Sequence, residues 1–152
     1  GTRRQRCASQ SRGSAAVISL LDTTALSAAM RYDEEMLAYL RSRRPGDTAT
    51  APPAVAEVEY GIRRLFEGSK RRVLLEHERD RLLGTVRVLE WTPRASERFG
   101  TIKAHLEHEG TMIDDMDIAI AAVAAAHEAV VVTANLVHFE RVPGVTATHW
   151  RE

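Results

Sequence analysis

The chain contains one cysteine, Cys7, among its 152 residues. A single cysteine cannot form a disulfide within the chain, and it cannot supply a cysteine-rich metal cluster. Disulfides are rare in compartments where thiols are kept reduced. The shortage of cysteine therefore favours a cytoplasmic protein, and any metal site must be built from other ligands.

Long apolar runs are also missing, since no stretch approaches the roughly 20 apolar residues that a membrane-spanning helix needs. We therefore expect no membrane partner. The opening stretch, GTRRQRCASQSRGSA, is basic and polar and lacks the apolar centre of a secretory signal. We interpret residues 1–16 as a disordered basic tail, or as a remnant of an expression vector or of upstream translation.

An excess of one charge sign is absent as well, because 21 basic residues balance 21 acidic ones. Four arginines lie in the tail, which has no acid, so residues 17–152 carry a net charge of −4. Proteins that bind nucleic acid non-specifically usually show a broad basic surface. Any contact with nucleic acid must therefore come from a local patch, or through metal ions held by the acids.

What is present is enough apolar material for a core, with 44% hydrophobic residues, and a length that suits one domain. Short apolar or alternating runs predict strands at Val17–Leu21, Thr48–Thr50, Thr85–Leu89 and Val130–Val132. Helical spacing predicts helices over Asp33–Arg43, Pro53–Glu67, Lys70–Leu83, Pro93–Glu109 and the segment that follows Asp114. Residues 17–152 are thus predicted to form a single α/β domain, with a central parallel sheet of four to five strands flanked by helices.

Polar side chains follow the strands at the points where ligands bind in such sheets, the carboxyl ends. Asp22 comes directly after the first strand, and Asn135 lies just beyond the last. Asp114 and Asp117 open the helix that leads into the last strand, and Glu57 lies in the helix that begins near Pro53. Mg²⁺ and Mn²⁺ prefer oxygen ligands of these kinds. If these side chains converge, they can hold a divalent cation.

Each acid also has a purely structural explanation. Asp22 and Asp114 can cap the helices that follow them. Glu59 lies four residues before Arg63, which predicts an ion pair on the helix surface. Asp114 and Asp117 share a helix face, where their repulsion would be relieved by a cation between them. The residues alone leave both explanations open.

A carboxylate pocket would have a specific chemical use. A phosphodiester is anionic, so carboxylates without a cation repel it. Metal ions reverse that repulsion, polarise the phosphoryl oxygen and lower the pKa of a bound water. Several acids from distant parts of the chain are therefore one solution for cleaving a nucleic-acid backbone.

Four stretches then resemble, in order, the motifs of the PIN-domain family. Leu20–Thr24 resembles its opening motif, a hydrophobic strand followed by Asp-Thr, and Ala56–Gly61 resembles its Ala-Glu-Leu-x-x-Gly motif. Gly110–Ala121 resembles the third motif, and Val132–Gly144 the fourth, which ends near Trp150. The similarity runs from about Val17 to Trp150. The most similar subgroup is the VapC toxins of type II toxin–antitoxin pairs.

The resemblance implies that Asp22, Glu57 and Asp117 are catalytic and bind a metal, Mg²⁺ or Mn²⁺. Asn135 falls where relatives place a fourth Asp or Asn, and we assign it to the catalytic set. Because an amide is neutral, it binds a cation more weakly than a carboxylate and weakens a second metal site. Asp114 would compensate as an auxiliary metal ligand.

Other residues have supporting roles in this interpretation. Thr24 and Thr133 would orient carboxylates or water through their hydroxyls. His138 stands where relatives have Asp or His, and it either contacts a ligand or is a loop histidine without a special role. Arg63 and Arg64 belong to a basic stretch that could guide RNA phosphates, although such stretches are more often solvated helix faces.

The resemblance implies a metal-dependent endoribonuclease that cleaves structured RNA, tRNA or rRNA, through a metal-activated water. It also implies a homodimer and a cognate antitoxin that blocks the site. The alternative is a PIN-like RNA-binding module with weak or absent metal catalysis, which Asn135 favours. A third interpretation is a structural partner that is active only in complex with its antitoxin.

Overall fold

The computed structural model describes residues 17–152, so the expected tail, residues 1–16, lies outside the described residues. Five parallel strands form one sheet in the order β3-β2-β1-β4-β5. The strands are β1 (Ser19–Leu21), β2 (Thr48–Thr50), β3 (Arg87–Val88), β4 (Val130–Val132) and β5 (Ala147–Thr148). This confirms the predicted α/β domain with a parallel sheet of four to five strands.

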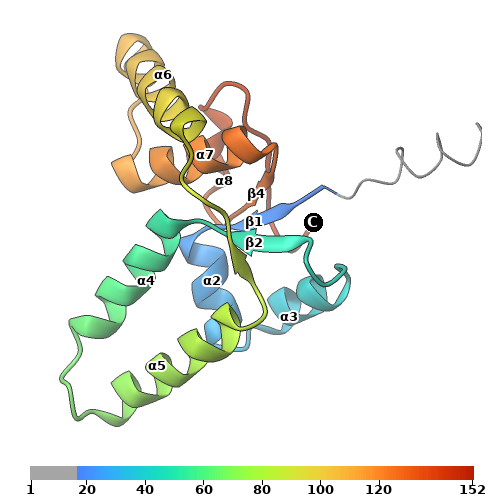
Figure 1. Ribbon diagram of the computed structural model, residues 1–152, viewed down its shortest axis with the longest axis vertical. Helices are drawn as coiled ribbons and strands as arrows, with labels where there is room; N and C mark the ends of the chain where they lie inside the picture. The colour runs from blue at the N-terminus through green and yellow to red at the C-terminus, as the bar shows by residue number, and fades with distance from the viewer. Residues whose placement is uncertain (1–16) are drawn as a thin grey trace, which may run out of the picture.

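The helices cover both faces of the sheet (Figure 1). One side carries α2 (Thr23–Met30), α3 (Glu34–Arg41), α4 (Pro52–Arg63) and α5 (Lys70–Leu83). The other carries α6 (Pro93–Glu109), α7 (Asp115–His127) and α8 (Leu136–Glu140). Connections between parallel strands are right-handed, so the helices change sides where the strand order reverses. Within residues 17–152, no helix is both long and apolar enough to span a membrane.

The order reverses at β1, because β2 and β3 lie on one side of it and β4 and β5 on the other. Leu20 and Leu21 of β1 are fully buried between the two helical layers. Every residue of α7 from Ile118 to Ala124 is also buried, as its alanine-rich sequence indicates. Ligands of open α/β sheets bind at the carboxyl ends of the strands beside such a reversal. The fold therefore directs attention to the ends of β1 and β4.

Several element bounds differ from the prediction. The helix expected to reach Glu67 ends at Arg63, and a turn then leads to Ser69, whose side chain accepts a hydrogen bond from the Arg72 N–H and caps α5. The strand expected over Thr85–Leu89 shrinks to β3, because it is an edge strand paired only with the three-residue β2. The short elements α8 and β5 were not predicted.

Candidate active site

Asp22 lies where β1 ends and α2 begins, and its side chain is almost fully buried, with 1% of the residue exposed. Its Oδ1 accepts hydrogen bonds from the Thr24 hydroxyl (2.6 Å) and from the Ala25 N–H (2.9 Å). Its own N–H donates to the Val132 carbonyl of β4 (3.1 Å). Asp22 therefore caps α2 and is fixed at the junction of the two central strands.

Burial raises the pKa of Asp22, because a charged carboxylate loses its water there. Hydrogen bonds from Thr133, Thr24 and the Ala25 N–H act in the opposite direction, and the negative charge of Asp117 raises the pKa further. The negative form of Asp22 is thus held in place by neutral donors alone. It is destabilised by its surroundings unless a cation is near.

Asp117 lies in the first turn of α7 and is partly buried. Burial also raises its pKa, and the charge of Asp114 adds to the effect. His138 lowers the pKa, since its Nδ1 lies 3.1 Å from Asp117 Oδ2. Asp22 and Asp117 come from distant parts of the sequence, yet they are close enough for their charges to interact.

Glu57 of α4 is held at the same end of the sheet by Thr23. The Thr23 hydroxyl donates a hydrogen bond of 2.6 Å to Glu57 Oε1. Thr23 directly follows Asp22, so one residue pair at the end of β1 connects to acids from two other elements. From the sequence we predicted a supporting role for Thr24 but none for Thr23. The first threonine of the Asp-Thr-Thr motif was the available signal.

Asp114 caps α7, because its Oδ1 accepts a hydrogen bond of 2.8 Å from the Met116 N–H. Asp115 points elsewhere and pairs with Lys103 on α6, at 3.1 Å. The structural explanation for Asp114 as a helix cap is therefore confirmed. Its charge nevertheless acts on Asp117, so the cap also belongs to the electrostatics of the site.

The end of β4 forms the opposite wall of the site. Thr133 is fully buried, and its hydroxyl accepts a hydrogen bond of 2.8 Å from the Asn135 N–H. The Ala134 N–H donates to the Thr24 hydroxyl (2.9 Å), so the ends of β1 and β4 are linked. Asn135 itself is exposed, and among the described residues its side chain makes no hydrogen bond and caps no helix.

Some acids outside the site have arginine partners, and Glu59 is one of them. Glu59 accepts hydrogen bonds from Arg63 (2.9 Å) and Arg79 (2.8 Å), and the bond from Arg63 is the main reason that its pKa is lowered. The predicted pair of Glu59 and Arg63 is thereby confirmed. Among the ion pairs between described residues, neither Asp22 nor Glu57 takes part. Within the described chain, Asp22 and Glu57 therefore have no ion-pair partner, whereas Asp117 has His138 beside it.

The two arginines predicted to guide RNA point to different surroundings. Arg63 is engaged with Glu59. Arg64 instead lines a groove that also contains Thr23 and Glu57. Only Arg64 of this pair therefore lines the same groove as Glu57.

The chain is similar in sequence to known proteins. A model of the PIN domain matches residues 19–145. "Ribonuclease VapC2" of Haemophilus influenzae is 30% identical over 129 residues, which cover 78% of this chain and 95% of that protein. "tRNA(fMet)-specific endonuclease VapC" of Salmonella typhimurium is 33% identical over 94 residues, which cover 62% of this chain and 68% of that protein.

The fold has a counterpart among solved structures. The crystal structure of DNA-bound VapBC from Salmonella typhimurium matches with a TM-score of 0.78 and 25% identity, over 88% of this chain and 98% of the matched chain. The matched segment of the PIN domain begins in β1 and includes all four candidate acids, Asp22, Glu57, Asp114 and Asp117. From the fold, the placement of the acids and these relatives, the chain belongs to the PIN-domain family and is similar to its VapC proteins.

Proposed function

We propose that this protein is a metal-dependent endoribonuclease and the toxin of a VapBC-like toxin–antitoxin pair. The observation that carries the proposal is the pair of Asp22 and Asp117 at the reversal point of the sheet, where both carboxyl pKa values are raised. Perturbed acids that meet at such a point mark functional sites more often than ordinary surface acids do. The relatives named as ribonucleases support the same reaction class.

The residues fit a divalent cation. Within residues 17–152, no three His, Cys, Asp or Glu side chains form a ready-made metal-binding group. Mg²⁺, however, usually keeps several waters and is held by one or two carboxylates. Asp22 and Asp117 supply two such oxygen ligands, and a cation between them would relieve the cost of burying their charge. Glu57 and Asp114 would add ligands or charge at the edge.

The chain's own residues orient these ligands. Thr24 and the Ala25 N–H hold Asp22 in one rotamer, and His138 holds Asp117. Such outer contacts fix a metal ligand in the position that binding requires. A divalent ion bound here would supply the positive charge that lets a phosphodiester approach and would activate a water nucleophile. Asn135 would complete the site as a neutral oxygen ligand from the end of β4.

Structured RNA, such as tRNA or rRNA, is the substrate we propose. The relative named as a tRNA(fMet)-specific endonuclease supports a tRNA target. RNA loops present splayed nucleotides that a shallow surface site can reach, whereas a continuous duplex does not. A target of this kind also agrees with a cytoplasmic location.

We further propose a cognate antitoxin that covers the acids, and a homodimer. The solved VapBC structure, a complex by its name, supports the antitoxin. Co-purification with the product of the adjacent gene tests for it.

Light scattering on the purified chain tests the homodimer, and a mass of one chain would contradict it.

The activity is tested by incubating the purified chain with total bacterial RNA in Mg²⁺, in Mn²⁺ and in EDTA, and mapping new 5′ ends. We expect a few discrete cuts that require the metal and are lost in Asp117→Asn. Cutting that persists in EDTA would refute the metal mechanism. Full activity in Asp117→Asn would refute the assignment of this residue.

A second candidate function is an RNA-binding module without efficient catalysis. Asn135 favours it, because a neutral amide stands where a fourth carboxylate would strengthen metal binding. In this case RNA would bind without being cut under either metal. Changing Asn135 to Asp would then be expected to create or increase cleavage.

A further inference from the structure

Two grooves flank α2 and meet beside the candidate active site. The first lies between α2, α4 and α5 and includes Glu57. The second runs past Ala134 and Trp150. Thr23 and Arg31 line both grooves. The two grooves therefore adjoin along α2. We call the first one the arginine groove, after Arg31, Arg64 and Arg71 on its walls.

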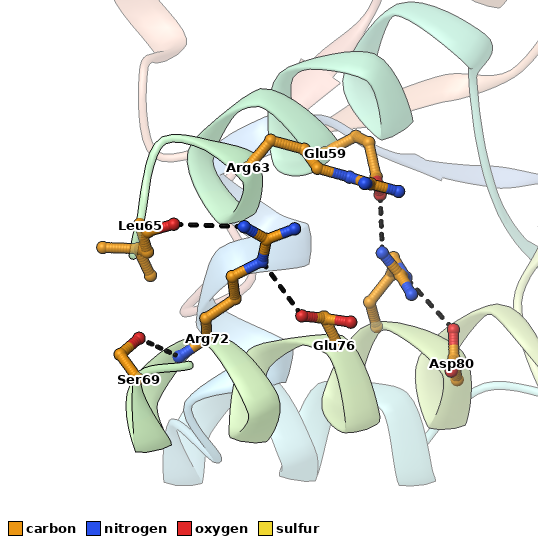
Figure 2. A network of polar contacts seen from close by, with 8 residues as sticks. Glu59, Arg63, Leu65, Ser69, Arg72, Glu76 and Asp80 are labelled. Carbon is orange, nitrogen blue, oxygen red and sulfur yellow. Dashed lines mark hydrogen bonds and ion pairs between the residues drawn. The ribbon is translucent and has the colours of Figure 1, made fainter. Parts of the chain in front are cut away.

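These three arginines are available for a ligand. Each is exposed, and none takes part in an ion pair between described residues. The arginines that face away from the groove on α4 and α5 differ in this respect. Figure 2 shows Arg63 directed to Glu59, and Arg72 between Glu76 and the Leu65 carbonyl.

The paired arginines and the unpaired arginines of this region therefore lie on different sides. On one side arginines and carboxylates neutralise each other, and on the groove side three arginines face a single acid, Glu57. A groove with this balance attracts an anionic ligand. A guanidinium can give two parallel hydrogen bonds to one phosphate, which makes arginine well suited to a phosphodiester backbone.

The groove is also lined by apolar side chains, including Val58, Ile62 and Leu75. Gly61 also lines it, and a Cβ built there would meet no atom within 4 Å, so the groove is open at this point. A groove lined by both apolar and cationic side chains can accept a ribose or the face of an unpaired base while the phosphates meet the arginines. A fully hydrated small anion would gain nothing from the apolar side chains.

We propose that the arginine groove binds the backbone of the RNA strand next to the phosphate that is cut. Arg31 contacts the strand where the two grooves meet, and Arg64 and Arg71 contact phosphates farther along. The inference rests on the proposed ribonuclease function and names the residues that position its substrate. They are positioning residues, because they lie beside the acids and are not part of the metal-binding set.

The test compares Arg64→Gln and Arg71→Gln with Arg63→Gln as the matched control. Arg63 adjoins Arg64 in sequence and carries the same charge, but it faces Glu59. Binding of a fluorescein-labelled, single-stranded oligoribonucleotide of mixed sequence is measured by anisotropy in EDTA, so that no cutting occurs. Thermal melting of each variant verifies the fold.

A phosphate contact with single-stranded nucleic acid changes the slope of log K against log salt by about 0.7. Each groove variant should therefore lose about 0.7 of that slope and bind roughly fivefold more weakly at 0.1 M salt. Arg63→Gln should bind like the unaltered chain. In Mg²⁺, Arg64→Gln should raise KM for cleavage of tRNA and leave kcat unchanged, as expected for a binding contact.

Equal losses in Arg63→Gln and Arg64→Gln would overturn the proposal, because they would show a general effect of net charge. Unchanged RNA binding in both groove variants would also overturn it and would point to a protein segment as the occupant. Failure of the proposed ribonuclease function looks different. In that case the chain cuts no RNA in any metal, while Arg64→Gln still weakens binding.

Discussion

At the scale of single residues, the site combines acids that are costly to bury with hydroxyls that hold them. Asp22 has neutral hydrogen-bond donors, whereas Glu59 on the same side of the molecule has two arginines. The shifts of the two pKa values accordingly have opposite signs. The buried carboxylate of Asp22, which has no cationic partner among the described residues, therefore costs the folded chain stability.

Asp22→Asn should therefore change how stability depends on pH. Because the folded pKa of Asp22 is raised above 3.8, the folded chain holds more protons than the unfolded one between that value and the folded pKa. The free energy of unfolding then falls as pH rises through this window, and the loss is complete above it. Asparagine cannot ionise and caps a helix as well as Asp does.

In EDTA, we expect the variant to be more stable than the unaltered chain at neutral pH and to lack this part of the pH dependence. Urea unfolding over a pH series measures both. Arginine-paired acids such as Glu59 give slopes of the opposite sign, but they are common to both proteins and cancel in the difference. Identical profiles for the two chains would contradict the role assigned to burial.

Thr23→Val should weaken metal binding without unfolding the chain. The change keeps the shape of the side chain but removes the hydrogen bond to Glu57. Loss of an outer contact that orients a ligand typically costs about 10- to 100-fold in metal affinity. Titration of Mg²⁺ against RNA cleavage, or against thermal stability, measures the loss. Thr101→Val, on the exposed surface of α6, is the control and should have no effect.

At the scale of elements, the site is built by helices whose first turns lie at the ends of strands. The amino terminus of α2 carries Asp22, and that of α7 carries Asp114 and Asp117. Each of these helices is anchored by a buried face, and α7 packs along α6 more extensively than any other pair of elements does. The position of Asp117 therefore depends on the core contacts that the buried residues of α7 make directly after it.

Ile120→Ala should test this anchoring. Ile120 is fully buried in α7, and removing its methyl and methylene groups leaves a cavity. Such changes cost about 2–5 kcal/mol of stability. Val137→Ala, at a site that is 61% exposed, should cost less than about 0.5 kcal/mol. Urea unfolding measures both. A loss at Ile120 no larger than that at Val137 would show that α7 is loosely packed.

At the scale of the whole molecule, charge is divided between regions. The described residues carry acids without arginine partners at the end of β1 and at the start of α7, and unpaired arginines in the adjoining groove. An RNA strand and a divalent cation would neutralise these two regions together. Metal binding and substrate binding are thus expected to support each other, since the cation also reduces the repulsion between the acids and the phosphates.

Mg²⁺ should stabilise the whole fold at neutral pH. A ligand that binds only the folded chain adds about 2.7 kcal/mol when its concentration is 100 times its Kd. The rise in Tm should shrink as pH falls through the raised pKa values of Asp22 and Asp117, because protonated carboxyls do not bind the ion. Differential scanning fluorimetry at several pH values measures the effect. An equal rise in Asp22→Asn would place the ion elsewhere.

Sequence alone was sufficient for the elements that local patterns control. The apolar run of β4, the alanine-rich α7 and the proline-led α6 were all recognisable, because the period of hydrophobic residues reflects the face that each element buries. The edge strand β3 and the end of α4 were placed less well. Their limits are set by the length of a neighbouring strand and by a turn, and neither is encoded in a local period.

The sequence by itself determined the parallel α/β fold and pointed to the candidate acids at the strand ends, since both follow from residue types and short spacings. Only the tertiary structure decided that Asp22 and Asp117 interact and that His138 contacts Asp117. Likewise, only the packing of α4 against α5 and α2 directs Arg64 into a groove and Arg63 toward Glu59. These outcomes depend on contacts between residues far apart in the chain, which no local pattern specifies.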